Sequence, residues 1–206
     1  MSVETTNLFK FASISQMPTM KKILPILSLL FLAIIIFVSS SFISPKEPIK
    51  LENKIATSIE WLTWEQAMER NKTVPKKLFV DVYTDWCGWC KKMDAGTFTD
   101  PEVVKYMSDN YYSIKLDAER KEKLIFKGDT FKYVANGRRG IHQFAATLLD
   151  NKMSYPSFVA LNEKAQRITV IPGYMEAHQI LPILNYIGEE KYLTTKYEDF
   201  IKTWAK

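Results

Sequence analysis

Two cysteines, Cys87 and Cys90, are the residues best suited to chemistry, and they are the only cysteines in the 206-residue sequence. Gly88 and Trp89 separate them, so at the start of a helix the two thiols could form a small disulfide ring. A thiolate at a helix N-terminus faces unpaired backbone N–H groups and the positive end of the helix dipole, so its pKa falls below the ordinary value of about 8.5. We therefore expect Cys87, the more exposed cysteine, to be a nucleophile and Cys90, one turn deeper, to resolve a mixed disulfide.

The residues around the cysteines favour a reactive pair over two buried structural thiols. Trp86 precedes the pair, Trp89 lies between the two cysteines, and two positive charges follow at Lys91 and Lys92. The positive charges favour the thiolate form of a nearby cysteine. Two inert structural thiols remain the alternative, but a structural role would not explain why aromatic and positively charged residues surround them.

The cysteine count and the charge pattern argue against several other classes of protein. Two cysteines so close together close no long loop, so the chain lacks the disulfide framework of a small secreted domain. A zinc site would need both His142 and His178, whose wide separation is unlike the histidine pair of a zinc finger. The 28 Lys and Arg residues exceed the 23 Asp and Glu residues only slightly and are scattered along the chain. We expect no metal, no cofactor and no nucleic-acid partner.

A buried strand is expected directly before the cysteines. Residues 78–83, which read LFVDVY, are apolar at both alternating sets of positions except for Asp81. This pattern is typical of a central strand covered by helices on both sides. Because the strand leads directly into Cys87, the cysteines open the following helix, which Gly96 should end. Residues 112–116 predict a second core strand.

Further helices and strands are expected to alternate through a domain at 58–206. A helix over 64–71 is indicated by Thr63 as its cap and by an apolar face. Residues 121–140 are expected to form an insertion, in which 124–134 resemble a hairpin around Gly128. The remaining expected elements are short strands near 59–61, 157–161 and 167–171, helices at 141–149 and 177–187, and an extra amphipathic C-terminal helix at about 192–205.

The N-terminal segment has the pattern of an export signal. No charged residue occurs from Ile23 to Pro45, and Lys21 and Lys22 precede this apolar run. We interpret residues 1–44 as a short tail followed by either a signal peptide or an uncleaved anchor helix. A linker at 45–57 follows. In both cases the basic flank stays inside, so the domain after it should be exported, either periplasmic or membrane-anchored and facing the periplasm.

The segment from Asp81 to Lys91, which reads DVYTDWCGWCK, resembles the strand–helix signature of the thioredoxin superfamily. Two further pieces follow in the expected order: Tyr155-Pro156 is similar to the family's cis-proline, and Gly173 follows the last strand. The likeness covers about 59–188. In detail the sequence looks like exported bacterial thioredoxin-like proteins with a WCGWCKK centre. The resemblance implies an α/β fold of three layers, in which helices flank a mixed central sheet.

The resemblance also implies roles for individual residues. Asp81 lies where thioredoxins carry a buried acid that exchanges a proton with the resolving cysteine through a raised pKa. A structural aspartate bonded to a neighbouring turn is the alternative. Tyr155 and Pro156 would lie in a loop that offers backbone groups to an extended substrate, unless the proline is trans and simply begins a strand. The expected substrate-binding set is completed by Trp86, Trp89 and Gly173. The two tryptophans could equally be packing residues.

Three features depart from the family pattern. Trp89 replaces the proline or histidine that is common between the cysteines, a position that helps to set the redox potential. Family members often carry a lysine beside the buried acid, but we expect Ser113 at the matching position, with Lys115 two residues further along. The insertion at 121–140 has no counterpart in a minimal thioredoxin. Its Gly-Arg-Arg-Gly motif at 137–140 could bind a partner or an anion, although such a motif is more typical of a turn.

These observations suggest a protein-disulfide oxidoreductase that acts outside the cytoplasm. Gly88 and Trp89 carry no charge that would stabilise a thiolate as strong oxidants do, so we expect the reducing or isomerising direction. Such a protein in an oxidising compartment needs electrons, so a membrane electron-donor relay is an expected partner besides protein thiols and disulfides. The alternative is a redox-inert thioredoxin-fold module that binds proteins or acts like a chaperone.

Overall fold

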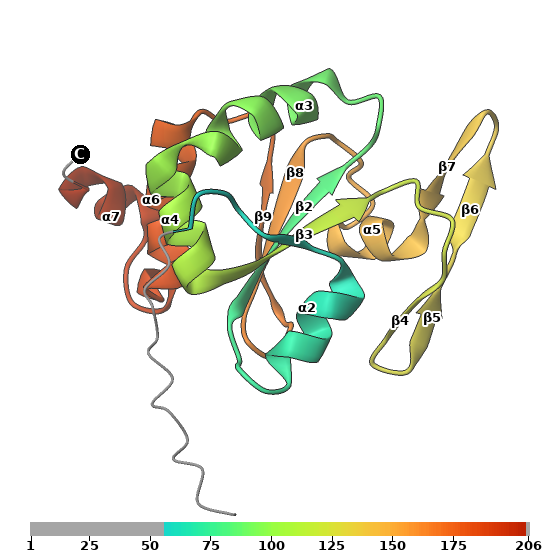
Figure 1. The fold of residues 1–206 in the computed structure, drawn as a ribbon, viewed down its shortest axis with the longest axis horizontal. Helices are drawn as coiled ribbons and strands as arrows, with labels where there is room; N and C mark the ends of the chain where they lie inside the picture. The colour runs from blue at the N-terminus through green and yellow to red at the C-terminus, as the bar shows by residue number, and fades with distance from the viewer. Residues whose placement is uncertain (1–55, 205–206) are drawn as a thin grey trace, which may run out of the picture. The chain divides into compact units, whose positions relative to one another are not determined.

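The computed structural model describes residues 56–204, which lie in a unit that spans Asn53–Lys206 (Figure 1). The expected N-terminal signal or anchor at 1–44 and most of the expected linker at 45–57 lie outside the described residues. Within 56–204, every helix is too short or too polar to cross a membrane.

A mixed sheet of five strands forms the centre of this unit (Figure 1). The strand order is β1-β3-β2-β8-β9. Strands β1, β3 and β2 are parallel, whereas β8 is antiparallel to β2 and β9 is antiparallel to β8. The five strands are β1 (Trp61–Leu62), β2 (Lys77–Tyr83), β3 (Tyr111–Asp117), β8 (Ser157–Leu161) and β9 (Arg167–Pro172).

Strand β2 lies in the middle of the sheet, and its side chains alternate between two hydrophobic cores. Leu78, Val80 and Val82 pack into one core together with Trp64 of α2, whereas Phe79 packs into the other. Helices therefore cover both faces of the sheet, which confirms the predicted three-layer α/β fold. The helices are α2 (Trp64–Asn71), α3 (Gly88–Ala95), α4 (Pro101–Asn110), α5 (Gln143–Leu148), α6 (Ala177–Gly188) and α7 (Tyr197–Thr203), with 3-10 turns η2 (Thr97–Thr99) and η3 (Lys191–Leu193).

The insertion contains two hairpins rather than the single one that the sequence predicts. Strands β4 (Leu124–Phe126) and β5 (Asp129–Phe131) form the expected hairpin, and β6 (Tyr133–Asn136) pairs with β7 (Arg139–His142) in a second one. The turn of the second hairpin contains Gly137, whose φ of 62° is in the left-handed region that favours glycine. Because Ile141 and His142 belong to β7, helix α5 begins two residues later than predicted.

The C-terminal helix is also divided. The single helix expected at about 192–205 is replaced by η3 and α7, with a break at Thr194 and Thr195 between them. Two consecutive β-branched threonines have a low helix propensity, which explains the break.

Candidate active site

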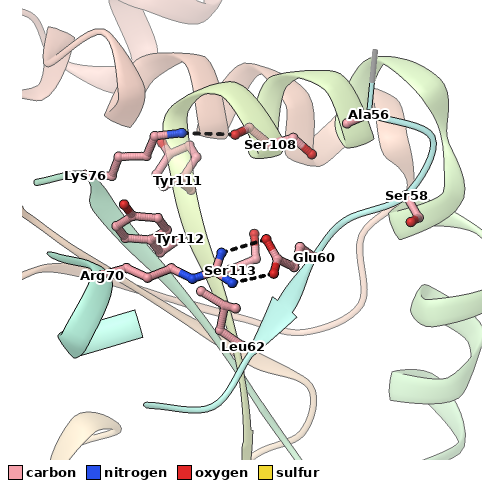
Figure 2. A pocket seen from close by; sticks show the side chains of 10 residues that line it. All are labelled: Ala56, Ser58, Glu60, Leu62, Arg70, Lys76, Ser108, Tyr111, Tyr112 and Ser113. Atoms are coloured by element: carbon pink, nitrogen blue, oxygen red, sulfur yellow. Dashed lines mark hydrogen bonds and ion pairs between the residues drawn. The ribbon is translucent and has the colours of Figure 1, made fainter. Parts of the chain in front are cut away.

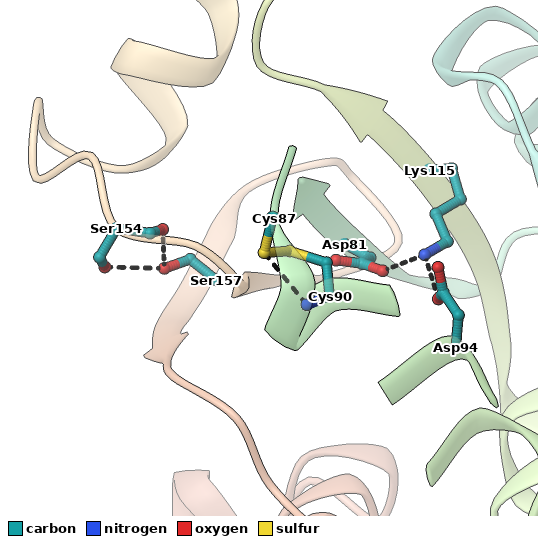
Figure 3. Close-up of a disulfide and its surroundings, with 7 residues drawn as sticks. All are labelled: Asp81, Cys87, Cys90, Asp94, Lys115, Ser154 and Ser157. Carbon is teal, nitrogen blue, oxygen red and sulfur yellow. Dashed lines mark hydrogen bonds and ion pairs between the residues drawn. A yellow bond between two sulfur atoms is a disulfide. The ribbon is translucent and has the colours of Figure 1, made fainter. Parts of the chain in front are cut away.

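The two cysteines form a disulfide at the N-terminus of α3 (Figure 3). Strand β2 ends at Tyr83, and the Cys87 N–H donates to the Thr84 carbonyl at 3.0 Å, which closes the turn between strand and helix. Cys87 is the N-cap residue, and its Sγ accepts the Cys90 backbone N–H at 3.1 Å. Both cysteines are buried, with Cys87 exposed by 5% and Cys90 by 2%. When the bond is reduced, this N–H and the helix dipole would stabilise a thiolate at Cys87.

Asp81 is buried on the face of β2 that α3 covers. Its side chain is 2% exposed, and its Oδ2 accepts from Lys115 Nζ at 2.5 Å. Its Oδ1 has no hydrogen-bond partner among the described residues. Figure 3 shows this carboxyl group between Cys90 and Lys115. Burial raises the pKa of Asp81 to about 6, and the attraction of Lys115 offsets only part of that effect.

The expectation that Ser113 lies beside the buried acid was wrong. The parallel register of β2 and β3 pairs Asp81 with Lys115, whereas Ser113 pairs with Phe79. Spacing along one strand does not determine its register against another, and this is why the sequence alone misplaced the lysine. The Lys115 ammonium also lies over the ring of Trp61 at 4.7 Å.

Asp94 belongs to this cluster, although the sequence analysis did not single it out. It forms an ion pair with the same Lys115 ammonium, and its side chain is 42% exposed (Figure 3). Burial disfavours the Lys115 ammonium, but Asp81 and Asp94 outweigh that effect and raise its pKa. A signal was available, because Asp94 follows Cys90 by four positions and such residues share one face of a helix. The three side chains link a buried carboxyl group to the surface.

The loop before β8 contains the cis-proline that the resemblance implied. The Tyr155–Pro156 peptide bond is cis, and Pro156 is buried. The Pro156 carbonyl accepts the Gly173 N–H at 2.9 Å, so the structure brings these two residues together. Ser157 Oγ donates to the Ser154 carbonyl at 2.7 Å within the same loop. Figure 3 shows Ser157 on the Cys87 side of the disulfide.

Both tryptophans of the motif are at the surface beside the disulfide. Trp86 is 49% exposed and Trp89 is 56% exposed, so neither is a core packing residue. The Trp86 ring meets the edge of Tyr155 at 5.8 Å between centroids, and its Nε1 donates to Glu119 at 3.2 Å. The Trp89 ring lies 5.1 Å from that of Tyr174. Two half-exposed indoles therefore flank the disulfide.

A separate pocket of about 230 Å³ lies beside β1, and it shares no residue with the disulfide site (Figure 2). Its charged side chains already have partners: Arg70 donates to both carboxylate oxygens of Glu60, and Lys76 donates to the Ser108 carbonyl. The charges of Arg70 and Glu60 therefore offset each other, whereas the Lys76 ammonium keeps its charge and is held by a backbone carbonyl. Within residues 56–204, no group of three or more His, Cys, Asp or Glu side chains is placed to hold a metal ion.

The sheet order, the helices on both faces and the Cys-Gly-Trp-Cys motif at the N-terminus of α3 define the thioredoxin-like class of fold. The family model Thioredox_DsbH, described as "Protein of unknown function, DUF255", matches residues 43–136. This match confirms the superfamily that the sequence resembled.

Among curated proteins, the chain is 27% identical over 112 residues to the thiol:disulfide interchange protein DsbD of Haemophilus ducreyi, covering 53% of this chain and 16% of that protein. It is 31% identical over 83 residues to an uncharacterized protein of Caenorhabditis elegans, covering 40% of this chain and 11% of that protein. The chain thus spans less than a fifth of the length of these relatives. A solved thioredoxin-fold protein from Helicobacter pylori is 22% identical with a TM-score of 0.48, covering 62% of this chain and 79% of that one. The family match, the DsbD relative and the cysteine pair together support a thiol–disulfide oxidoreductase.

Proposed function

We propose that this chain exchanges disulfides with protein substrates, in the reducing or isomerising direction, outside the cytoplasm. The observation that carries the proposal is the position of Cys87 Sγ, which caps α3 and accepts the Cys90 N–H. A sulfur in this position is stabilised as a thiolate, and the thiolate is the form that attacks a disulfide.

The exchange proceeds through a mixed disulfide. The Cys87 thiolate attacks one sulfur of the substrate disulfide, the substrate S–S bond breaks, and the released substrate thiolate takes up a proton. Cys90 then loses its proton and attacks Cys87 Sγ, which restores the Cys87–Cys90 disulfide and releases the second substrate thiol. Two electrons pass from the cysteine pair to the substrate. A dithiol reductant must return them before the next cycle.

Asp81 is proposed to accept the proton of Cys90 and return it later. A group with a pKa of about 6 can both take and release a proton near neutral pH. Its second carboxyl oxygen has no partner among the described residues, so it is free to receive that proton. Lys115 and Asp94 hold the other oxygen and connect it to the surface.

We infer the reducing direction from the charges around the sulfur. Gly88 and Trp89 offer no charge to a thiolate at Cys87, and an ionised Asp81 would oppose one. Lys91 and Lys92 favour the thiolate, but both are exposed and screened by solvent and salt, so they offset little of this effect. We expect a potential nearer that of thioredoxin, about −270 mV, than that of the strong oxidants at about −120 mV. The apolar run from Ile23 supports export, and a protein with this potential would receive electrons from a membrane reductant relay.

Insulin reduction with dithiothreitol tests the proposal. The wild type should exceed the background rate, and the Cys90→Ser variant should accumulate mixed disulfides through Cys87. A wild-type rate equal to background would instead support a redox-inert binding module. Equilibration in glutathione buffers tests the direction, since a potential more oxidising than about −180 mV would indicate an oxidase.

A further inference from the structure

The second hairpin of the insertion reaches the disulfide site. Arg139, the first residue of β7, places its guanidinium 4.3 Å from the centre of the Trp86 ring. Trp86 directly precedes Cys87 and also contacts Tyr155 of the cis-proline loop. The insertion therefore meets the cysteine motif and the cis-proline loop at one indole ring.

The insertion is attached firmly to the domain. Leu124 of β4 is fully buried in the core, and Phe126 and Phe131 pack against Phe144 of α5, with ring centroids 5.8 and 5.1 Å apart. At the end of β7 the buried His142 donates its N–H to the Ala118 carbonyl at 2.7 Å. These contacts hold the start of β4 and the end of β7, so the hairpin between them has a defined position beside Trp86.

Packing inside the β6–β7 hairpin leaves no room for a side chain at Gly140. A Cβ built there would lie 2.3 Å from the Val134 carbonyl oxygen and 2.4 Å from the Tyr133 ring. The Lys121 ammonium covers the Tyr133 ring at 3.0 Å from its centre. The glycine thus allows the two strands to lie close together next to Arg139. Gly140 therefore serves the packing of the two strands, whereas Gly137 lies in the turn between them.

Positive charge without an ion-pair partner lies on both sides of the disulfide. Within residues 56–204, neither Arg138 nor Arg139 forms an ion pair. On the other side, the Lys92 ammonium lies over the rings of Trp89 and Tyr174 at 4.9 and 4.8 Å and is also without an ion-pair partner in that range. A cation stacked on a ring can still bind a carboxylate with its remaining N–H donors.

Three carboxylates lie close to the same surface. Glu119 accepts the Trp86 Nε1–H, Asp85 is exposed next to Trp86, and Asp117 is near enough for its charge to act on both. None of the three forms an ion pair with Arg139 in the described part of the chain. The Arg139 guanidinium therefore stays available to the carboxylate of a partner.

We propose that the β6–β7 hairpin is a substrate-docking arm, and that it selects polypeptide segments with an Asp or Glu beside the oxidised cysteine. Arg139 pairs with that carboxylate while the exposed face of Trp86 packs against apolar groups of the segment. This proposal rests on the proposed function and names the class of substrate. An extended polypeptide fits the surface because two half-exposed indoles and the cis-proline loop border the same disulfide.

The size of the selection follows from the exposure of the arginines. Exposed ion pairs contribute about 0.2–1 kcal/mol, which corresponds to a preference in kcat/KM of about 1.5- to fivefold. The preference should shrink in 1 M salt, where the Debye length falls to about 3 Å.

The test compares two peptides that each contain one intramolecular disulfide and differ only in Glu or Gln at the positions flanking one cysteine. Reduction is followed with dithiothreitol as the electron donor, and each rate is divided by the rate with dithiothreitol alone. We expect the wild type to prefer the Glu peptide. Arg139→Gln should abolish most of this preference, and Arg139→Lys, which keeps the charge, should restore much of it.

Lys164→Gln is the matched control, because Lys164 is exposed in the turn at the opposite end of β8. This variant should keep the full preference, and thermal unfolding should show that all variants fold. Equal corrected rates for the two peptides with the wild type, or an unchanged preference in Arg139→Gln, would overturn the docking arm while leaving the oxidoreductase intact. If the wild type reduces none of the three substrates, that is, the two peptides and insulin, then the proposed function fails and the docking arm fails with it.

Discussion

Replacing Asp81 by asparagine should change how the stability of the folded protein depends on pH. Asp81 has a pKa of about 6 in the folded protein against an ordinary value of 3.8, because its carboxyl group is buried. Between these values the folded state binds the proton more tightly than the unfolded state does. The wild type therefore loses stability as pH rises through this window, which is the opposite of the behaviour of a carboxylate whose pKa is lowered by an ion pair.

The magnitude follows from the pKa difference. From 3.8 to about 6, at about 1.4 kcal/mol per pKa unit, the linkage amounts to about 3 kcal/mol. Asparagine does not titrate. The free energy of unfolding of Asp81→Asn minus that of the wild type should therefore rise by about this amount between a pH below 3.8 and a pH above 6.

Urea unfolding of the oxidised wild type and variant across this pH range measures the difference. Asp109→Asn is a suitable control, because Asp109 is 57% exposed and pairs only with Lys105 on the surface, so its effect should vary by less than about 1 kcal/mol. A difference between Asp81→Asn and the wild type that does not vary with pH would refute the raised pKa, and with it the proton-exchange role.

Three further predictions follow from the site and the core. The pH dependence of iodoacetamide alkylation should give the Cys87 thiol of the reduced protein a pKa below about 8.5, because Cys87 caps α3; an ordinary thiol pKa would remove the nucleophile assignment. Asp94→Asn should lower the pKa of Asp81, because it removes a nearby negative charge, and NMR titration of the carboxyl carbon would detect this; an unchanged pKa would show that Asp94 does not act on the acid. Phe79→Ala should cost about 3–5 kcal/mol in urea unfolding, since Phe79 is fully buried, whereas Val74→Ala at a 56% exposed position should cost less than about 0.5 kcal/mol. Equal costs for these two variants would contradict the assignment of the core.

The arrangement of the cysteine motif could be predicted from the sequence because it depends on neighbours along the chain. An apolar strand that leads into two cysteines three positions apart places them at a helix start, and the structure has Cys87 as the N-cap of α3. The bounds of α2 agree with the prediction for the same reason, since Thr63 caps the helix with its own side chain. Such features depend on interactions within a few residues.

The sequence by itself therefore determined the three-layer fold, the position of the disulfide and the buried acid at Asp81. Only the tertiary structure showed that Lys115 lies opposite Asp81, that Asp94 shares this lysine, and that Arg139 lies over Trp86. Each of these contacts joins segments that are distant in the sequence. Strand register and the packing of an insertion depend on the free energy of the whole domain, and no local pattern of residues specifies them.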